Sequence, residues 1–409
     1  MSVKVAVVGA GPSGCYLAQA LRKSLPDSNV TILDRLPIPF GLVRYGVAPD
    51  HQGTKAITKQ FARLFEREGV AFLGNVELGR DVNLDDLLEL FNVVVLATGL
   101  SADKTLGPEF TDVPCLYGAG DLTRLWNGHP DQENFLPDLG DTTCVIGNGN
   151  VAMDIVRLLA KGAEDFDGSD IKGEAISTSL RHIHLIGRSP ADKAKFDAAM
   201  TRELGKIAGV TVDMATPLPA DTEDKGLMEL HALAGKAGTG GKTLSFHFDT
   251  SPVRPILQGG RTTGLACERN GEETIIPCDS IVTAIGFDGD DTGGRGGLLA
   301  AAIDRDSGQL ADRLFATGWY RRGATGTIAA NRADAKAVAA RIVDVVTDAP
   351  DGTRSGLAGL RERLHHQTTD YADWLAIDVV ERQMAPPHRV RSKLTTRADM
   401  LAVCTERKA

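Results

Sequence analysis

The chain has 409 residues, of which 42% are apolar and 24% are charged, and its formal net charge is −9. This length exceeds what one hydrophobic core normally organises, so we expect a globular protein of two domains. The negative charge argues against general nucleic-acid binding, and no apolar run approaches the roughly 18 residues that a membrane span needs.

The start of the chain predicts a β-α-β unit. An apolar strand over 3–8 leads into Gly9-Ala10-Gly11-Pro12-Ser13-Gly14, a helical pattern follows over 12–23, and a strand over 30–33 ends at Asp34. Glycines at these places permit a tight turn, close approach of the backbone to a pyrophosphate, and close packing of helix on strand. The helix N-terminus favours the phosphate charge, and Asp34 is placed to accept hydrogen bonds from ribose hydroxyls. We therefore predict a dinucleotide site here.

A further helix and strand and then a turn-rich region separate this unit from a second one. Helical patterning over 54–68 and an apolar strand over 92–97 complete the first part. Between 100 and 141 four prolines mark turns, so we place the crossover between domains there. The sequence Gly118-Ala119-Gly120-Asp121, inside this stretch, is interpreted as a turn.

The second unit repeats the fingerprint with informative differences. A strand leads into Gly147-Asn148-Gly149-Asn150-Val151-Ala152, with a helix predicted over 151–159 and further strands over 181–186, 243–248 and 281–285. The strand over 181–186 ends in Gly187-Arg188 where the first unit has an acid. Because a guanidinium can bind a 2′-phosphate that a carboxylate would repel, Arg188 favours NADP(H) over NAD(H). The alternative role for Arg188 is an ordinary exposed charge at a strand end.

Three further segments resemble a known family. They cover 39–51 (Pro-Phe-Gly-Leu-Val-Arg-Tyr-Gly-Val-Ala-Pro-Asp-His), 74–79 (Gly-Asn-Val-Glu-Leu-Gly) and 318–328 (Gly-Trp-Tyr-Arg-Arg-Gly-Ala-Thr-Gly-Thr-Ile). With the two fingerprints, and with Trp374, Ile377-Asp378 and 389–393, they resemble the adrenodoxin reductase-like family of ferredoxin–NADP(+) reductases, including its actinobacterial members. The resemblance implies an α/β fold of two doubly wound, Rossmann-like nucleotide-binding domains in a glutathione reductase-like arrangement. The FAD-binding domain would be discontinuous, 1–100 and 312–409, and the NADP(H)-binding domain would span 101–311.

The same resemblance assigns cofactor-binding residues. Those for FAD are Gly9, Gly11, Ser13, Gly14, Asp34, Leu42, Leu78, Trp319, Gly326, Thr327 and Ile328, and those for NADP(H) are Asn148, Gly149, Asn150, Val151, Arg188, Ser189 and Gly326. Trp319 and the 326–328 backbone would line the isoalloxazine ring, and Gly326 would also lie near the nicotinamide. A purely structural role is the alternative for Trp319.

Two positions depart from the family pattern. The family typically has two adjacent arginines where this chain reads Arg188-Ser189, and a glutamate near the adenosine ribose where this chain has Met200. Both changes weaken the case for strict NADPH selectivity, so NADH remains an alternative coenzyme. Lys193 or Lys195 is a candidate for the missing charge, although a solvated surface is the more ordinary place for either.

Two further sites follow from matched positions and local charge. His51 and Glu203 match a histidine and an acid that the family has near the redox centre. Since hydride transfer needs no general base, they would supply polarity and a proton to the reduced flavin, with a structural hydrogen bond as the alternative. The segment 181–206 carries an excess of basic residues that would steer an acidic ferredoxin, and Arg202 is the strongest candidate within it.

The sequence thus predicts an FAD-dependent ferredoxin–NADP(+) reductase, in which NAD(P)H delivers hydride to FAD and single electrons pass to a ferredoxin. A cytochrome P450 system is one acceptor that the family allows. No metal-ligand pattern is visible, so the iron–sulfur centre is expected on the partner.

The alternatives are a flavin subunit of a larger complex, like the glutamate synthase small subunit, and a non-catalytic redox-sensing module. Six scattered cysteines without a C-x-x-C disfavour disulfide reduction, and an early first strand leaves no room for a signal peptide, so we expect a cytoplasmic enzyme.

Overall fold

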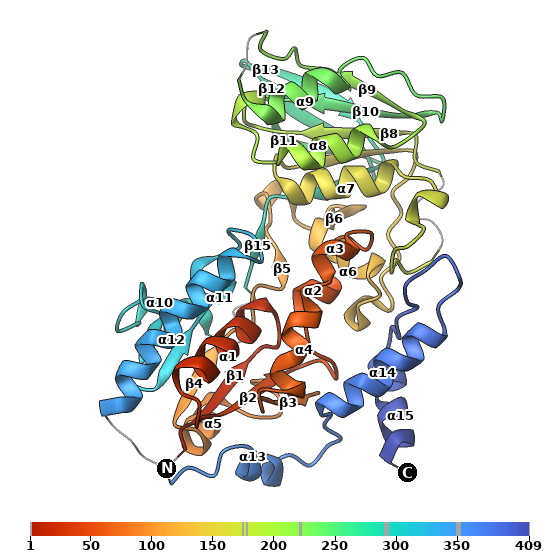
Figure 1. The fold of residues 1–409 in the computed structure, drawn as a ribbon. Coiled ribbons are helices and arrows are strands. Elements are labelled where there is room, and N and C mark those ends of the chain that lie inside the picture. Colours follow the sequence, from red (N-terminus) through yellow and green to blue (C-terminus); the bar gives the residue numbers. More distant parts are fainter. Residues whose placement is uncertain are drawn as a thin grey trace. The chain divides into compact units, whose positions relative to one another are not determined.

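The chain forms two compact units in the computed structural model, which describes residues 2–173, 176, 179–220, 223–289, 294–348 and 353–408 (Figure 1). Unit 1 comprises Met1–Ala102, Asn127–Glu133 and Phe287–Ala409. Unit 2 comprises Asp103–Trp126 and Asn134–Gly286. The expected α/β class with two doubly wound units is confirmed, whereas the cofactor that each unit holds stays a prediction.

Unit 1 is built around a six-stranded sheet with the strand order β16-β17-β4-β1-β2-β3. All strands are parallel except β16, which runs antiparallel to β17. The strands are β1 (Lys4–Val8), β2 (Asn29–Asp34), β3 (Ala71–Gly74), β4 (Val93–Leu96), β16 (Gln309–Ala311) and β17 (Leu314–Ala316).

Both faces of this sheet are buried. On one face Val5 and Val7 pack with helices α1 (Pro12–Ser24) and α12 (Ala330–Asp348), which lie side by side (Figure 1). Ala6 and Val8 belong to a second cluster on the other face. Strands covered on both faces need apolar residues throughout, which is why the sequence shows continuous apolar runs there. The remaining helices are α2 (Gly41–Tyr45), α3 (Gln52–Lys55), α4 (Thr58–Glu66), α5 (Leu84–Leu90), α10 (Arg295–Ala300), α11 (Trp319–Arg322), α13 (Leu357–Arg363), α14 (Tyr371–Gln383) and α15 (Arg397–Lys408).

The return of the chain to unit 1 comes earlier than the residue 312 that the sequence suggested. Residues from Phe287 onward belong to unit 1 because α10 packs Leu299, and β16 packs Leu310, into the second apolar cluster. Short, weakly apolar elements of this kind leave little periodic signal in a sequence.

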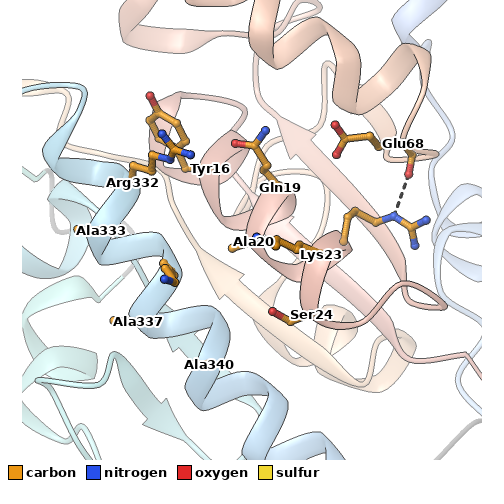
Figure 2. Close-up of a pocket in the computed structure, with 12 residues that line it drawn as sticks. Tyr16, Gln19, Ala20, Lys23, Ser24, Glu68, Arg332, Ala333, Ala337 and Ala340 are labelled. Carbon is orange, nitrogen blue, oxygen red and sulfur yellow. Dashed lines mark hydrogen bonds between the residues drawn. The ribbon is translucent and has the colours of Figure 1, made fainter.

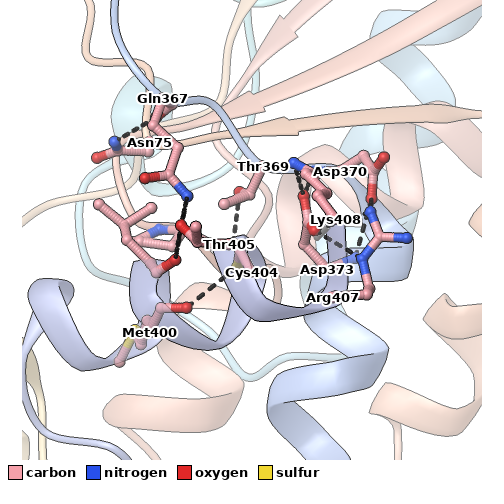
Figure 3. A network of polar contacts seen from close by, with 12 residues as sticks. Asn75, Gln367, Thr369, Asp370, Asp373, Met400, Cys404, Thr405, Arg407 and Lys408 are labelled. Atoms are coloured by element: carbon pink, nitrogen blue, oxygen red, sulfur yellow. Dashed lines mark hydrogen bonds and ion pairs between the residues drawn. The ribbon is translucent and has the colours of Figure 1, made fainter.

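The C-terminal helices are tied to the edge of the unit 1 sheet by a polar network (Figure 3). Asn75, just after β3, donates its side-chain amide to the carbonyl of Gln367 at 2.8 Å, and Gly74 forms an isolated bridge with Thr369. The Asp373 carboxylate on α14 accepts hydrogen bonds from Arg407 at 2.8 Å and from Lys408 at 2.7 Å. The segment 74–79 is therefore held in place by residues almost 300 positions away in the chain.

Unit 2 contains a second six-stranded sheet, entirely parallel, with the strand order β6-β14-β7-β8-β10-β9. One face of it is covered by a three-stranded antiparallel sheet, since Leu265 and Cys267 of β12 pack against Cys144 and Ile146 of β7. The strands are β6 (Leu116–Gly118), β7 (Thr142–Ile146), β8 (His182–Ile186), β9 (Val210–Met214), β10 (Lys242–His247), β11 (Ser251–Gln258), β12 (Arg261–Arg269), β13 (Glu272–Pro277) and β14 (Ser280–Thr283). The helices are α6 (Ala119–Trp126), α7 (Asn150–Ala160), α8 (Ala198–Gly205) and α9 (Lys225–Leu233). The short strands β5 (Ala102–Asp103) and β15 (Phe287–Asp288) form a two-stranded pair.

The interpretation of 118–121 as a turn was wrong. Gly118 ends β6, and α6 begins at the next residue. The Asp103 carboxylate accepts hydrogen bonds from the backbone N–H groups of Gly120 at 2.9 Å and Asp121 at 3.2 Å, which satisfies the start of this helix. A capping acid from a distant strand cannot be recognised in the local sequence.

Among the helices of the described ranges, none is long and apolar enough to cross a bilayer.

Candidate functional site

The loop between β1 and α1 has the geometry of a dinucleotide fingerprint. Gly9 adopts a φ of +116°, and a Cβ added there would collide with the carbonyl oxygen of Ala97. A Cβ on Gly14 would collide with the carbonyl oxygen of Gly9. A Cβ on Gly11, by contrast, would have no described protein atom within 4 Å. Two glycines are thus required by the protein itself, and the middle one leaves open space where a pyrophosphate would lie.

The N-terminus of α1 is open to an anion. Its first turn contains no acidic residue, and no side chain caps it. At the end of β2, the Asp34 carboxylate accepts hydrogen bonds from the N–H groups of Ala10 at 2.8 Å and Leu36 at 2.9 Å, which braces the loop. Burial raises the pKa of the Asp34 carboxyl, and these two hydrogen bonds oppose the rise. A carboxylate has acceptor sites beyond two, so the predicted contact with ribose hydroxyls remains available to it.

The segment 39–51 packs directly on this loop. The Phe40 N–H donates to the Ala10 carbonyl at 2.9 Å, and a Cβ on Gly41 would lie 3.1 Å from the Gly11 Cα. Leu42 follows on α2 and is half-buried. Leu78, in the turn after β3, is also half-buried and forms an isolated bridge with Val82.

The segment 318–328 reaches the same loop from the other end of the chain. A Cβ on Gly318 would collide with Ser13 Oγ, and Ser13 Oγ donates to Asn331 Oδ1 at 3.2 Å. The Trp319 ring stacks on Phe287 with centroids 5.7 Å apart, yet its buried Nε1 has no hydrogen-bond acceptor among the described residues. A buried indole N–H without an acceptor is unusual in a folded protein and fits a missing partner such as a flavin. Gly326 and Thr327 are exposed and Ile328 is half-buried, immediately before α12.

The loop between β7 and α7 repeats this geometry in unit 2. Gly147 has a φ of +150°, and a Cβ there would collide with the carbonyl oxygen of Ala284. A Cβ on Gly149 would again have no described atom within 4 Å. Ala152, at the third position, is fully buried. Each unit therefore presents one open loop at the start of a long helix.

Polar atoms of the second loop differ in how they are used. Both side-chain atoms of Asn148, Oδ1 and Nδ2, are buried without a partner among the described residues. Asn150 instead donates Nδ2 to Asp197 Oδ2 and accepts from the Asp197 N–H, both at 2.8 Å. Unsatisfied Asn148 atoms fit a site that binds a polar ligand, whereas the Asn150 side chain is already engaged with Asp197. Val151 is exposed.

The residues at the end of β8 include an exposed arginine. Arg188 is exposed beyond the strand, and within the described ranges its guanidinium has no ion-pair partner. Ser189 is half-buried, and its carbonyl accepts a hydrogen bond from the Asp249 N–H at 3.1 Å. Lys193 lies 3.7 Å from Asp192, and Met200 is half-buried on α8.

His51 and Glu203 lie in different units. His51 precedes α3 in unit 1, where its carbonyl accepts from the Lys55 N–H at 3.1 Å. Glu203 lies on α8 in unit 2, with its carboxylate 3.6 Å from Nε of the buried Arg157. An ion pair with a buried arginine is a structural role for Glu203, and the role of both residues near the flavin stays a prediction.

Sequence reasoning missed a buried ionic cluster that links two of the family segments. Glu381 on α14 is fully buried, and it pairs with Arg44 of α2 and, at 2.8 Å, with Arg391. Arg391 also pairs with Asp378 at 2.6 Å, and the guanidinium of Arg44 lies 5.1 Å from the Trp374 ring centroid. The C-terminal motif residues therefore support α2, which contacts the first loop. Their scattered spacing gives no local signal for such a cluster.

Two basic surfaces are candidates for partner binding. Arg202, the residue favoured from the sequence, forms hydrogen bonds with Glu229 of α9 at 2.7 and 2.9 Å, so much of its charge is compensated. In unit 1 an open groove of about 1070 Å³ runs between α1 and α12 (Figure 2). Lys23, Arg332 and Lys336 line it, with Glu68 as its acidic lining residue.

Comparison with known proteins agrees with this geometry. A family model described as an NAD(P)-binding Rossmann-like domain matches residues 7–64. The chain is 44% identical over 411 residues to cindoxin reductase of Citrobacter braakii, covering 97% of this chain and 90% of that protein. It is 31% identical to the mitochondrial NADPH:adrenodoxin oxidoreductase of Arabidopsis thaliana, covering 97% and 94%.

A solved structure extends the similarity to the fold. FprA of Mycobacterium tuberculosis in complex with NADPH matches with a TM-score of 0.89 at 29% identity, over 98% of this chain and 99% of that one. The resemblance inferred from the segments 39–51, 74–79 and 318–328 is thereby confirmed. This chain belongs to the adrenodoxin reductase-like family of ferredoxin–NADP reductases.

Proposed function

We propose that this protein is an FAD-containing enzyme that uses NADPH to reduce a ferredoxin-type iron–sulfur protein. The main support for this function is the pair of open fingerprint loops, one in each unit, in a chain that belongs to this family. FAD would be held in unit 1 by the loop 9–14, Asp34, and the segment 318–328. NADPH would be held in unit 2 by the loop 147–152 and Arg188.

The cofactor supplies the chemistry, because a bound flavin accepts hydride and releases electrons singly. The residues of the chain bind and orient it. The N-termini of α1 and α7 would receive phosphate groups, Gly11 and Gly149 would give the backbone access to them, and the unpartnered Trp319 N–H would donate to the flavin.

The first test follows the flavin by absorbance. Anaerobic NADPH should bleach the visible absorbance of the purified enzyme, and an added ferredoxin should restore it. Bleaching without reoxidation by any ferredoxin would contradict the partner assignment. A redox-sensing module would show no sustained turnover in this assay, and a subunit of a larger complex would need its other subunits before an acceptor is reduced.

Arg188→Ala should separate the two coenzymes. Loss of the guanidinium removes a charge-assisted contact to the 2′-phosphate, so the KM for NADPH should rise about tenfold or more while that for NADH stays nearly constant. Steady-state kinetics with a small acceptor such as ferricyanide gives both constants. An equal rise for NADPH and NADH would remove the 2′-phosphate role and leave Arg188 as an ordinary strand-end charge.

We further propose that an acidic ferredoxin docks on the α1–α12 groove in preference to the 181–206 surface. Arg202 is already paired with Glu229, whereas the groove combines Lys23, Arg332 and Lys336. Lys23→Glu with Lys336→Glu should raise the KM for ferredoxin about tenfold at low salt, with ferricyanide reduction unchanged. If Arg202→Glu alone has that effect and the double variant none, the partner binds the 181–206 surface.

The enzyme is proposed to act in the cytoplasm, feeding a ferredoxin that in turn supplies a cytochrome P450 or another acceptor. All six cysteines are free, as expected for a reducing compartment. Fractionation of cells that express the protein would test this location, and enrichment outside the cytoplasmic fraction would refute it.

A further inference from the structure

The segment that follows Ala194 is fixed against the second fingerprint loop. The Lys195 N–H donates to the Asn148 carbonyl at 2.7 Å, and Gly149 and Lys195 form an isolated parallel bridge. Two residues later, Asp197 exchanges two hydrogen bonds with the Asn150 side chain, both 2.8 Å. The backbone of Lys195 is thus held on both sides beside the open space over Gly149.

The ammonium group of Lys195 is available to interact with a ligand. The residue is exposed, and no ion pair of its ammonium group occurs within the described parts of the chain. The neighbouring Lys193 differs, because it lies 3.7 Å from Asp192. Asp197 also brings a carboxylate to Asn150, the first residue of α7, where a phosphate would bind. A cation beside the loop offsets that repulsion.

We propose that Lys195 binds the pyrophosphate of the coenzyme in the second loop. The inference rests on the proposed coenzyme site of unit 2. A lysine suits this task because its ammonium is a mobile point charge on a four-carbon stem and needs no fixed planar geometry. NADPH and NADH share the pyrophosphate, so Lys195 contributes equally to both. Arg188 is then left to distinguish NADPH from NADH.

Two nucleotide probes separate these roles in the flavin-loaded enzyme. ADP contains the pyrophosphate but no 2′-phosphate, and 2′-AMP contains the 2′-phosphate but no pyrophosphate. Titration calorimetry should show that Lys195→Ala weakens ADP about five- to tenfold and leaves 2′-AMP within about twofold. Arg188→Ala should do the reverse, Lys195→Arg should retain ADP binding, and the matched control Lys193→Ala should change neither.

Other results of these titrations would contradict the proposed role of Lys195. Unchanged ADP affinity in Lys195→Ala, or equal weakening of ADP and 2′-AMP, would overturn the assignment while leaving the proposed reductase intact. A wild-type enzyme that binds neither nucleotide would overturn the coenzyme site of unit 2 and the Lys195 role with it. The flavin content and the melting temperature of every variant are the folding controls. Wild-type values show that a loss of nucleotide affinity is not caused by misfolding.

Discussion

Replacing Gly11 by valine should give a folded protein that purifies without flavin absorbance. Gly11 has φ −75° and ψ −176°, an extended conformation that valine adopts readily, and no described atom lies within 4 Å of its Cβ position. The Cβ atom therefore fits the protein, and the side chain would fill the space proposed for the pyrophosphate. The ratio of flavin to protein absorbance, with circular dichroism as a check on folding, measures the effect.

The same substitution in the second loop is the matched control. Gly149 has φ −123° and ψ −179°, again with open space at its Cβ position. Gly149→Val should retain flavin that dithionite reduces but NADPH and NADH do not. Full flavin in Gly11→Val would show that the first loop does not hold FAD, and an exchange of the two phenotypes would reverse the assignment of the units.

Glu381→Ala should be among the most destabilising single substitutions in unit 1. The carboxylate is fully buried, pairs with Arg44 and Arg391, and accepts the Leu394 N–H at 3.0 Å. Arg391 would keep Asp378, but Arg44 would be left as a buried cation without a carboxylate. Breaking a buried pair in this way costs about 3–5 kcal/mol.

Thermal unfolding measures this loss. Unit 1 of Glu381→Ala should lose roughly 10 °C in Tm. Flavin should also be released at a lower temperature than in the wild type, because Arg44 lies on α2. Arg382→Ala is the control: its side chain is 58% exposed and pairs with Asp378 at 2.7 Å, so its effect should stay below about 1 kcal/mol. Equal Tm values for the two variants would show that the buried cluster contributes little.

The geometry of the two fingerprint loops could be predicted because their signals are local. An apolar strand, glycines at fixed spacing and a helix start all fall within one β-α unit, and Gly14 is needed for a close approach to Gly9 inside it. Gly9 and Gly147 are needed for a different reason, because the backbone of Ala97 or Ala284, just after the neighbouring strand β4 or β14, approaches them closely. The segments 39–51 and 318–328 were identified through family resemblance. Their packing on the first loop, through Phe40 and Gly318, depends on tertiary contacts that no local pattern encodes.

The antiparallel sheet of unit 2 was missed although a signal was present. Its two hairpins turn at Gly259-Gly260 and at Asn270-Gly271, and all four residues have positive φ. Two-residue loops of this composition between β-branched or apolar runs are typical of hairpins. The Glu381 cluster is a different case, because its members lie in separate segments and only the folded chain brings them together.

The division of the chain sets the order in which the protein can be completed during synthesis. Unit 2 takes most of its residues from the continuous stretch 134–286 and the rest from 103–126, whereas unit 1 needs both 1–102 and 287–409. Domains generally fold as units while the ribosome elongates the chain. Unit 2 can therefore fold while unit 1 still lacks β17, α12 and α14, and the contact between Gly318 and Ser13 forms only after residue 318 has emerged. With FAD in unit 1 and the coenzyme in unit 2, as proposed, flavin capture would be a late event, and truncated nascent chains should bind coenzyme before they bind FAD.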